Sequence, residues 1–194
     1  MKKYCFLAAL IMSGFVQVGC APAVVKPDFA AKQKAQALVD KGTLALRAGE
    51  LEKAAAAYSV ATEVAPIAAA YDGLGCVAFM DGRYRQAESF YKKALELDEN
   101  YYDVLGNLAL LYHQQGKDKL ARRYYLEALK KQPDNYRVRN NYAVFLYEKI
   151  GPYNAEIELK KALSLVEHPV IVNNINKLRK HQNGKGKKRR NSRN

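Results

Sequence analysis

Few residues of this 194-residue chain have the types and spacing that chemistry requires. The three cysteines, Cys5, Cys20 and Cys76, lie far apart, and the three histidines lack the paired spacing of a zinc site. The sequence groups no nucleophile with a general base and an orienting residue. We therefore expect no enzymatic activity, no metal and no cofactor.

One glycine motif falls inside a predicted helix. The segment from Gly73 to Ala78 reads G-x-G-x-x-A, which in dinucleotide-binding proteins follows a β-strand of a βαβ unit. No such strand precedes it here, so it predicts no cofactor site. Cys76 lies within this segment, and we expect it to be a small buried hydrophobe rather than a redox thiol.

The segment that precedes Cys20 has the features of a secretion signal. Two lysines precede an apolar stretch from Tyr4 to Val18, and Gly19-Cys20-Ala21 follows. This order is typical of a bacterial secretory signal. The stretch is shorter than the about 20 apolar residues that a transmembrane helix needs. We expect residues 1–19 to be removed.

Gly19-Cys20 resembles the end of a lipobox, where cleavage leaves the cysteine as a lipidated first residue. The resemblance implies an outer-membrane lipoprotein facing the periplasm, with Cys20 as the lipidation site and residues 20–34 as a tether. Gln17 departs from the apolar residue that is usual there. The alternative is cleavage after Ala23 by the general peptidase, which would give a soluble periplasmic protein.

Four segments repeat along the body of the chain at intervals of 33, 34 and 34 residues. Equivalent positions form three columns of small residues and one column of bulky residues, mostly rings. The small columns are Gly42, Gly75, Ala109 and Ala143; Ala54, Ala87, Ala121 and Ala155; and Ala61, Ala94, Ala128 and Ala162; the bulky column is Tyr58, Tyr91, Tyr125 and Leu159.

These columns resemble the tetratricopeptide repeat (TPR) from about Ala35 to His168. The resemblance implies an all-α solenoid of helix-turn-helix units, with about four repeats over residues 35–169. Facing small residues let the two helices of a repeat approach closely, and the bulky residue fills the space toward the next repeat. The chain lacks the pattern's Trp and keeps its Pro only at Pro66 and Pro133.

The last part of the chain changes character after Pro169. Val172, Ile175 and Leu178 recur at helical spacing and predict a capping helix over residues 170–182, which a terminal repeat needs. Residues 183–194 are basic, interrupted by glycine and without apolar side chains, which predicts disorder.

The net charge of +13 belongs largely to this end of the chain. Residues 177–194 hold nine basic residues and no acidic ones, which leaves +4 for the rest. Such a tail suits anionic lipid or peptidoglycan; the alternative is that it only keeps the protein soluble. Secretion argues against nucleic acid as a partner. The residues predicted to contact an anionic surface are Lys185, Lys187, Lys188, Arg189 and Arg190.

A stack of such hairpins has a concave groove lined by the first helix of each repeat, and the resemblance implies a protein or peptide partner there. Asn107 and Asn141 share one column, and their amides can bind a peptide backbone without reading its sequence. The alternative is that they bond within the array. The other predicted groove residues are Phe79, Leu110, Gln114, Asn140 and Tyr147.

The chain also resembles TPR lipoproteins that assist biogenesis of type IV and tight-adherence pili, in the segments from Gly106 to Tyr112 and from Asn140 to Tyr147. This implies a non-enzymatic scaffold that assists assembly of a pilus or secretion machine in the bacterial envelope. The alternative is a general periplasmic adaptor for cell-wall or envelope enzymes, with its basic tail on an anionic surface.

Overall fold

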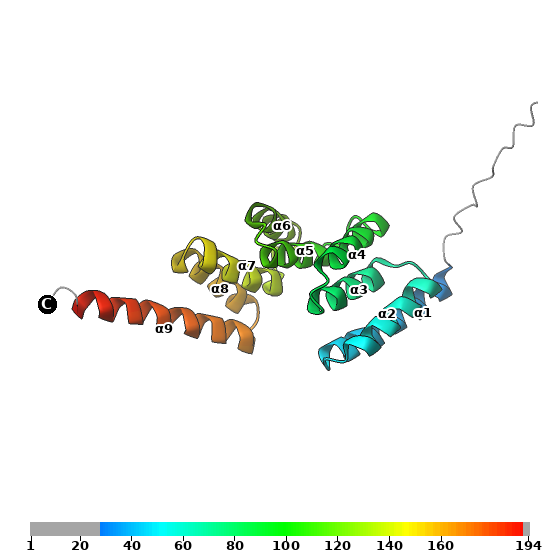
Figure 1. Cartoon of the computed structure of the whole chain (residues 1–194), viewed down its shortest axis with the longest axis horizontal. Helices are drawn as coiled ribbons and strands as arrows, with labels where there is room; N and C mark the ends of the chain where they lie inside the picture. The colour runs from blue at the N-terminus through cyan, green and yellow to red at the C-terminus, as the bar shows by residue number, and fades with distance from the viewer. Residues whose placement is uncertain (1–27, 192–194) are drawn as a thin grey trace, which may run out of the picture.

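A computed structural model describes the backbone of residues 28–191 and the side chains of residues 28–180. All regular elements of this part are helices, arranged as a row of antiparallel pairs (Figure 1). The helices are α1 (Phe29–Arg47), α2 (Leu51–Val64), α3 (Ala68–Met80), α4 (Tyr84–Leu97), α5 (Asp103–Gln114), α6 (Asp118–Lys131), α7 (Tyr136–Lys149), α8 (Pro152–Leu165) and α9 (Pro169–Asn191). The predicted all-α TPR solenoid is confirmed. The predicted signal segment and Cys20 lie outside the described residues.

Each repeat is one helical hairpin whose first helix also contacts the first helix of the next repeat. The hairpins are α1 with α2, α3 with α4, α5 with α6 and α7 with α8. Across repeats, α1 contacts α3, α3 contacts α5, and α5 contacts α7. The first helices therefore form one continuous layer, and side chains on neighbouring first helices can meet.

Glycine ends the first helices of the first three repeats. Gly49 and Gly82 have φ values of +79° and +73°, which side chains with a Cβ rarely adopt. The N–H of the residue after Gly82, Arg83, donates to the Ala78 carbonyl over 2.8 Å, which satisfies a carbonyl of the last turn. The left-handed glycine thus ends the helix and lets the second helix start at once.

The bulky column fills the space between successive first helices. The ring of Tyr58 lies between Gly42 of α1 and Gly73 of α3, and a Cβ on Gly42 would come within 2.7 Å of it. Tyr91 packs against Gly75 in the same way. The two small columns that follow along each second helix are fully buried alanines. Small residues therefore set the helix spacing, and one bulky residue per repeat sets the distance to the next repeat.

The hydrophobic core consists of two clusters. One joins α1, α2 and part of α3 around Tyr58. The other extends from α3 to α9 and contains Tyr91, Tyr125 and Leu159. Because α3 supplies residues to both clusters, it connects the first hairpin to the rest of the stack.

α9 occupies the place of the first helix of a fifth repeat. Its buried residues Ile171, Ile175 and Leu178 each follow a buried α7 residue by 33 positions. Those α7 residues are Val138, Tyr142 and Phe145. Val172, which the sequence pattern placed on the packed face, is only half-buried.

Helical backbone extends beyond the predicted limits at both ends. α1 begins at Phe29, within the segment predicted as a tether, because Asp28 caps it by accepting from the Ala31 N–H over 2.6 Å. α9 continues to Asn191 and so covers most of the segment predicted as disordered. Lysine and arginine favour helix, and the packed first turns of α9 supply its nucleus.

Candidate peptide-binding groove

A cavity of about 230 Å³ lies on the groove between α5 and α7. Three of the predicted groove residues, Leu110, Gln114 and Asn141, line it. The other residues that line it are His113, Val144, Glu148 and Lys149. The fold therefore brings together an apolar side chain and two neutral amides from adjacent repeats.

Asn107 is held by the neighbouring repeat. Its Nδ2 donates to the Asp72 carboxylate of α3 over 2.8 Å, and the Tyr101 hydroxyl donates to the other oxygen of that carboxylate over 3.4 Å. Asn107 is half-buried at this contact. Its amide therefore forms a hydrogen bond within the array, which was the alternative to peptide binding in the sequence analysis.

The same bond recurs between α9 and α7. Asn174, which follows Asn141 by 33 residues, donates from Nδ2 to the Asn140 Oδ1 over 2.9 Å. Asn140 is 8% exposed, so it joins two helices rather than presenting a free amide to the groove. In both cases the asparagine bonds a side chain of the preceding repeat. The bonded residue comes one position before the residue that aligns with the asparagine.

Asn141 lacks an acceptor of this kind. The residue of the preceding repeat that corresponds to Asp72 is Gly106, which has no side chain to accept a hydrogen bond. Within the described side chains, the hydrogen bond recorded for Asn141 is the one that its Oδ1 accepts from Asn140 over 3.4 Å. Its own N–H donors are not used there. Since Asn141 is half-buried in the groove cavity, it is the amide of this column that a ligand can reach.

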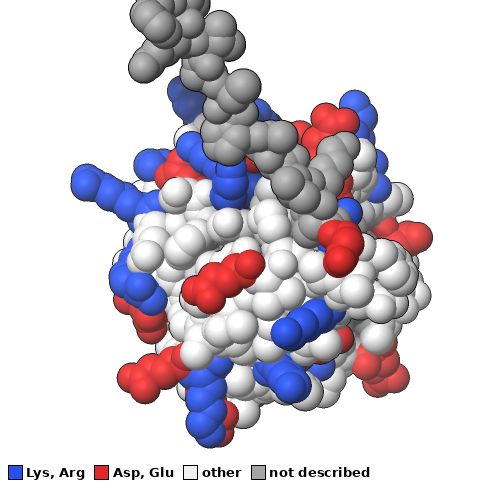
Figure 2. All heavy atoms as spheres, turned by 90° about the vertical axis from the view of Figure 1, so that its right-hand side faces the viewer, with Lys and Arg blue, Asp and Glu red and all other residues white. Residues whose placement is uncertain are grey.

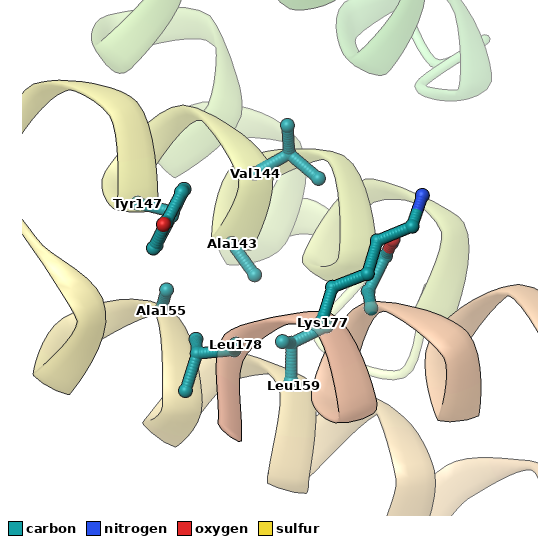
Figure 3. Close-up of a pocket in the computed structure, with 8 residues that line it drawn as sticks. Ala143, Val144, Tyr147, Ala155, Leu159, Lys177 and Leu178 are labelled. Atoms are coloured by element: carbon teal, nitrogen blue, oxygen red, sulfur yellow. The ribbon is translucent and has the colours of Figure 1, made fainter. Parts of the chain in front are cut away.

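The remaining predicted groove residues lie elsewhere. The Phe79 ring packs against Tyr84 at the α3–α4 hairpin, with 5.7 Å between ring centroids. Tyr147 lines a different cavity, of about 370 Å³, between α7, α8 and α9 (Figure 3). Sequence reasoning missed this second cavity, although Leu159 in the column of rings was a visible signal. The five tail residues from Lys185 to Arg190 lie outside the described side chains.

Burial controls the ionisable groups near the groove. Enclosure between α3 and α5 raises the pKa of Asp72 to about 6, the nearby Asp103 carboxylate adds to the rise, and the bonds from Asn107 and Tyr101 oppose it. Burial also raises the pKa of the Cys76 thiol, whose sulfur accepts from the Tyr91 hydroxyl over 3.7 Å. Cys76 therefore stays a thiol, not a reactive thiolate.

The described residues contain no group of three or more histidine, cysteine or acidic side chains that could hold a metal. His113 is 9% exposed, with its Nε2 3.0 Å from the Glu148 Oε2 and its ring edge against Phe145. It joins α5 to α7. None of the described helices combines the length and apolar character needed to span a bilayer.

Charge is distributed unevenly along the array. Acidic and basic side chains are interspersed at the end that carries α1 and α2 (Figure 2). At the other end, Lys177, Arg179 and Lys180 are exposed on α9. These three cations give the exposed side of α9 a local positive charge.

Two family models described as tetratricopeptide repeat match residues 39–102 and 78–139. The chain belongs to the tetratricopeptide-repeat family. The chain shares its fold with a solved structure of PilF from Pseudomonas aeruginosa. The TM-score is 0.68 at 24% identity, over 80% of this chain and 72% of the other.

The sequence of the TPR protein is similar to parts of several curated proteins. It is 39% identical over 80 residues to the type IV pilus assembly protein PilF of Pseudomonas aeruginosa, covering 41% of this chain and 32% of PilF. It is 35% identical over 100 residues to the photosystem I assembly protein Ycf3 of Cyanophora paradoxa, covering 48% of this chain and 57% of Ycf3. The match thus spans about a third of one relative and just over half of the other.

Another similar protein has a catalytic name. The protein O-mannosyl-transferase TMTC3 of Homo sapiens is 37% identical over 67 residues, which cover 34% of this chain and 7% of the transferase. The shared segment is therefore a small part of that enzyme. Two of these three relatives are named as assembly proteins.

Proposed function

We propose that this TPR protein is a non-enzymatic scaffold that binds an extended segment of a protein partner in its concave groove. The observation that carries the proposal concerns Asn141 in the cavity between α5 and α7, whose N–H donors bond none of the described side chains. An amide both donates to and accepts from a peptide backbone. Leu110 and Val144 in the same cavity offer apolar contacts to the side chains beside that backbone.

The proposed role of this binding is to assist assembly of a pilus or secretion machine in the bacterial envelope. Its support is the similarity to PilF and to Ycf3, both named as assembly proteins. In the same proposal, Cys20 is lipidated and attaches the array to the outer membrane on its periplasmic side. Its support is the Gly19-Cys20 segment after an apolar signal.

The groove is tested by an affinity capture from crosslinked envelopes with the native protein and two single variants. We expect the native protein to recover a component of the machine, and Asn141→Ala to lose most of it. The matched variant is Asn107→Ala, at the equivalent position of the preceding repeat, whose amide is held by Asp72. Equal recovery with native protein and Asn141→Ala would contradict the proposed groove.

The membrane attachment is tested separately. We expect the mature protein to begin with a lipid-modified Cys20 in intact-mass measurements, and Cys20→Ser to move it from the membrane fraction to the soluble periplasm. An unmodified mature chain that begins after Ala23 would instead establish cleavage by the general peptidase.

The second candidate function is a general adaptor for cell-wall or envelope enzymes. The exposed basic residues in the middle of α9 favour it, because they suit an anionic surface. They are Lys177, Arg179 and Lys180. Recovery of cell-wall enzymes, with no pilus or secretion component, in the capture experiment would select this function over machine assembly.

A further inference from the structure

The column of rings ends before the last repeat. Tyr58, Tyr91 and Tyr125 are almost fully buried. Tyr58 lies between the first helices of two successive repeats, Tyr91 packs against α3, and Tyr125 packs against two rings of α7. The fourth repeat has Leu159 instead, although α9 follows it in the place of a further first helix. At this interface, the ring that fills the first three is missing.

A cavity of about 370 Å³ occupies this place. Its floor is formed by the buried residues Ala143, Ala155, Leu159 and Leu178. Figure 3 shows Ala143 and Tyr147 of α7 on the side that faces Ala155 and Leu159 of α8 and Leu178 of α9, whereas Val144 points the other way. The volume is at the lower end of the range of ligand pockets and suits one large apolar side chain.

The rim of the cavity carries one positive charge. Lys177 of α9 is exposed and runs along one side of the cavity (Figure 3). No acidic residue lines the cavity, and no ion pair of Lys177 occurs among the described side chains. Two further side chains with polar groups line the cavity: Asn174, whose amide is bonded to Asn140, and Tyr147. As far as the side chains up to residue 180 show, the cavity therefore combines an apolar interior with a cation that has no ion-pair partner.

This cavity adjoins the cavity of the proposed groove. Val144 lines both, so one continuous surface leads from the Asn141 amide to the apolar floor beside Leu159. A peptide whose backbone contacts Asn141 therefore needs only to continue past Val144 to reach the second cavity.

We propose that this cavity binds the last residue of the partner, a C-terminal aromatic side chain, with the terminal carboxylate paired to Lys177. The aromatic ring takes the place of the ring missing from the column. This proposal rests on the proposed peptide binding in the groove. It adds that the bound peptide ends in an aromatic residue with a free carboxylate.

The test uses the full chain and small probes in a methyl and amide NMR titration. The probe is acetyl-Gly-Phe with a free carboxylate, and the comparison probes are acetyl-Gly-Phe amide and acetyl-Gly-Ala. We expect the free acid to shift the Leu159 and Leu178 methyl signals. We also expect it to bind more tightly than the amide, by up to about fivefold, since exposed ion pairs contribute up to about 1 kcal/mol. We expect no measurable binding of acetyl-Gly-Ala.

Two variants locate the binding. Leu159→Tyr restores the ring of the column, fills the cavity, and should weaken binding of acetyl-Gly-Phe at least tenfold. Leu126→Tyr, which adds the same ring at an exposed position of α6, is its control and should bind as the native chain does. Lys177→Gln should abolish the preference for acid over amide, and its exposed position keeps the test decisive if Leu159→Tyr fails to fold.

Undiminished binding to folded Leu159→Tyr, equal binding of acid and amide, or no binding of the acid at millimolar concentration would each overturn the proposal. The failure of the groove is distinguishable, because there Asn141→Ala leaves partner capture unchanged while the probe still shifts the Leu159 methyls. The converse result, capture that depends on Asn141 with no response to the probe, would retain the groove and remove the terminal pocket.

Discussion

Asn107 donates to Asp72 over 2.8 Å, whereas Asn141, its equivalent one repeat later, has Gly106 where Asp72 would be. Identical side chains at equivalent positions therefore have different roles. The first is a bond between α3 and α5, and the second is an amide open to the groove. The difference depends on a residue in another helix, not on the asparagine itself.

Truncation of these two amides should separate stability from binding. Asn107→Ala leaves the half-buried Asp72 carboxylate short of a donor, so we expect the free energy of unfolding to fall by about 1–3 kcal/mol. Asn141→Ala removes an amide that bonds only weakly within the array, and we expect a change within about 0.5 kcal/mol. Urea unfolding followed by circular dichroism measures both. A larger loss for Asn141→Ala than for Asn107→Ala would reverse our assignment.

Asp72 should make stability depend on pH. Its pKa is raised to about 6 in the folded protein, above the unfolded value, so the folded state binds more protons between about pH 4 and pH 6. The free energy of unfolding should therefore decrease as pH rises through this window, by an amount on the order of 1–3 kcal/mol. Thermal unfolding at pH 4.5 and pH 7.5 measures it.

Asp72→Asn should remove most of this pH dependence, because an amide oxygen can still accept from Asn107 without carrying a charge. Asp103→Asn, at an exposed position of α5, is the matched control and should keep most of it. An unchanged pH profile in Asp72→Asn would show that another group is responsible.

The hydroxyl of Tyr125 is buried and has no hydrogen-bond partner in the part of the chain that the structure describes. Tyr125→Phe should therefore leave the free energy of unfolding unchanged or raise it by up to about 1 kcal/mol. Tyr58→Phe is the comparison, because the Tyr58 hydroxyl lies 3.2 Å from the Thr43 Oγ1. Its loss should cost about 0.5–1.5 kcal/mol, and denaturant titrations that rank the two variants in the opposite order would contradict this assignment.

Arg139 and Glu158 should be coupled across the last hairpin. They are 2.7 Å apart, their side chains are only 16% and 13% exposed, and Arg139 also donates to the Pro133 carbonyl. We expect a double-mutant cycle to give a coupling free energy of about 1–3 kcal/mol. The pair Lys53 and Glu50, which is 74% and 46% exposed, should give at most about 0.5 kcal/mol in the same experiment.

The hairpins were predictable because their packing repeats in the sequence. Alanine recurs at two positions of each second helix, and all eight of these alanines are fully buried. Gly42 and Gly75 mark where a ring of the next helix packs. Such contacts lie within one period of the chain, so an alignment of the chain with itself is enough to find them.

The different hydrogen bonding of Asn107 and Asn141 was not predictable from the alignment of the repeats. The acceptor of Asn107 lies 35 residues earlier in another repeat, and only the stacking of α3 on α5 brings the two together. The second cavity was missed for a related reason. Leu159 aligns with the rings, but the sequence pattern predicts α9 only as a capping helix. The 33-residue interval that relates α9 to α7 becomes evident from the packing of the two helices.

The two hydrophobic clusters have a consequence for how the array opens. The first hairpin holds its own cluster around Tyr58 and meets the rest of the stack through α3. Because a solenoid is stabilised by contacts between neighbours, its ends can detach while the middle stays folded. Amide hydrogens of α1 and α2 should therefore exchange with solvent before those of α5 and α7. The protein then behaves as a chain of linked units, with partly opened forms populated well below the temperature at which the whole array is lost.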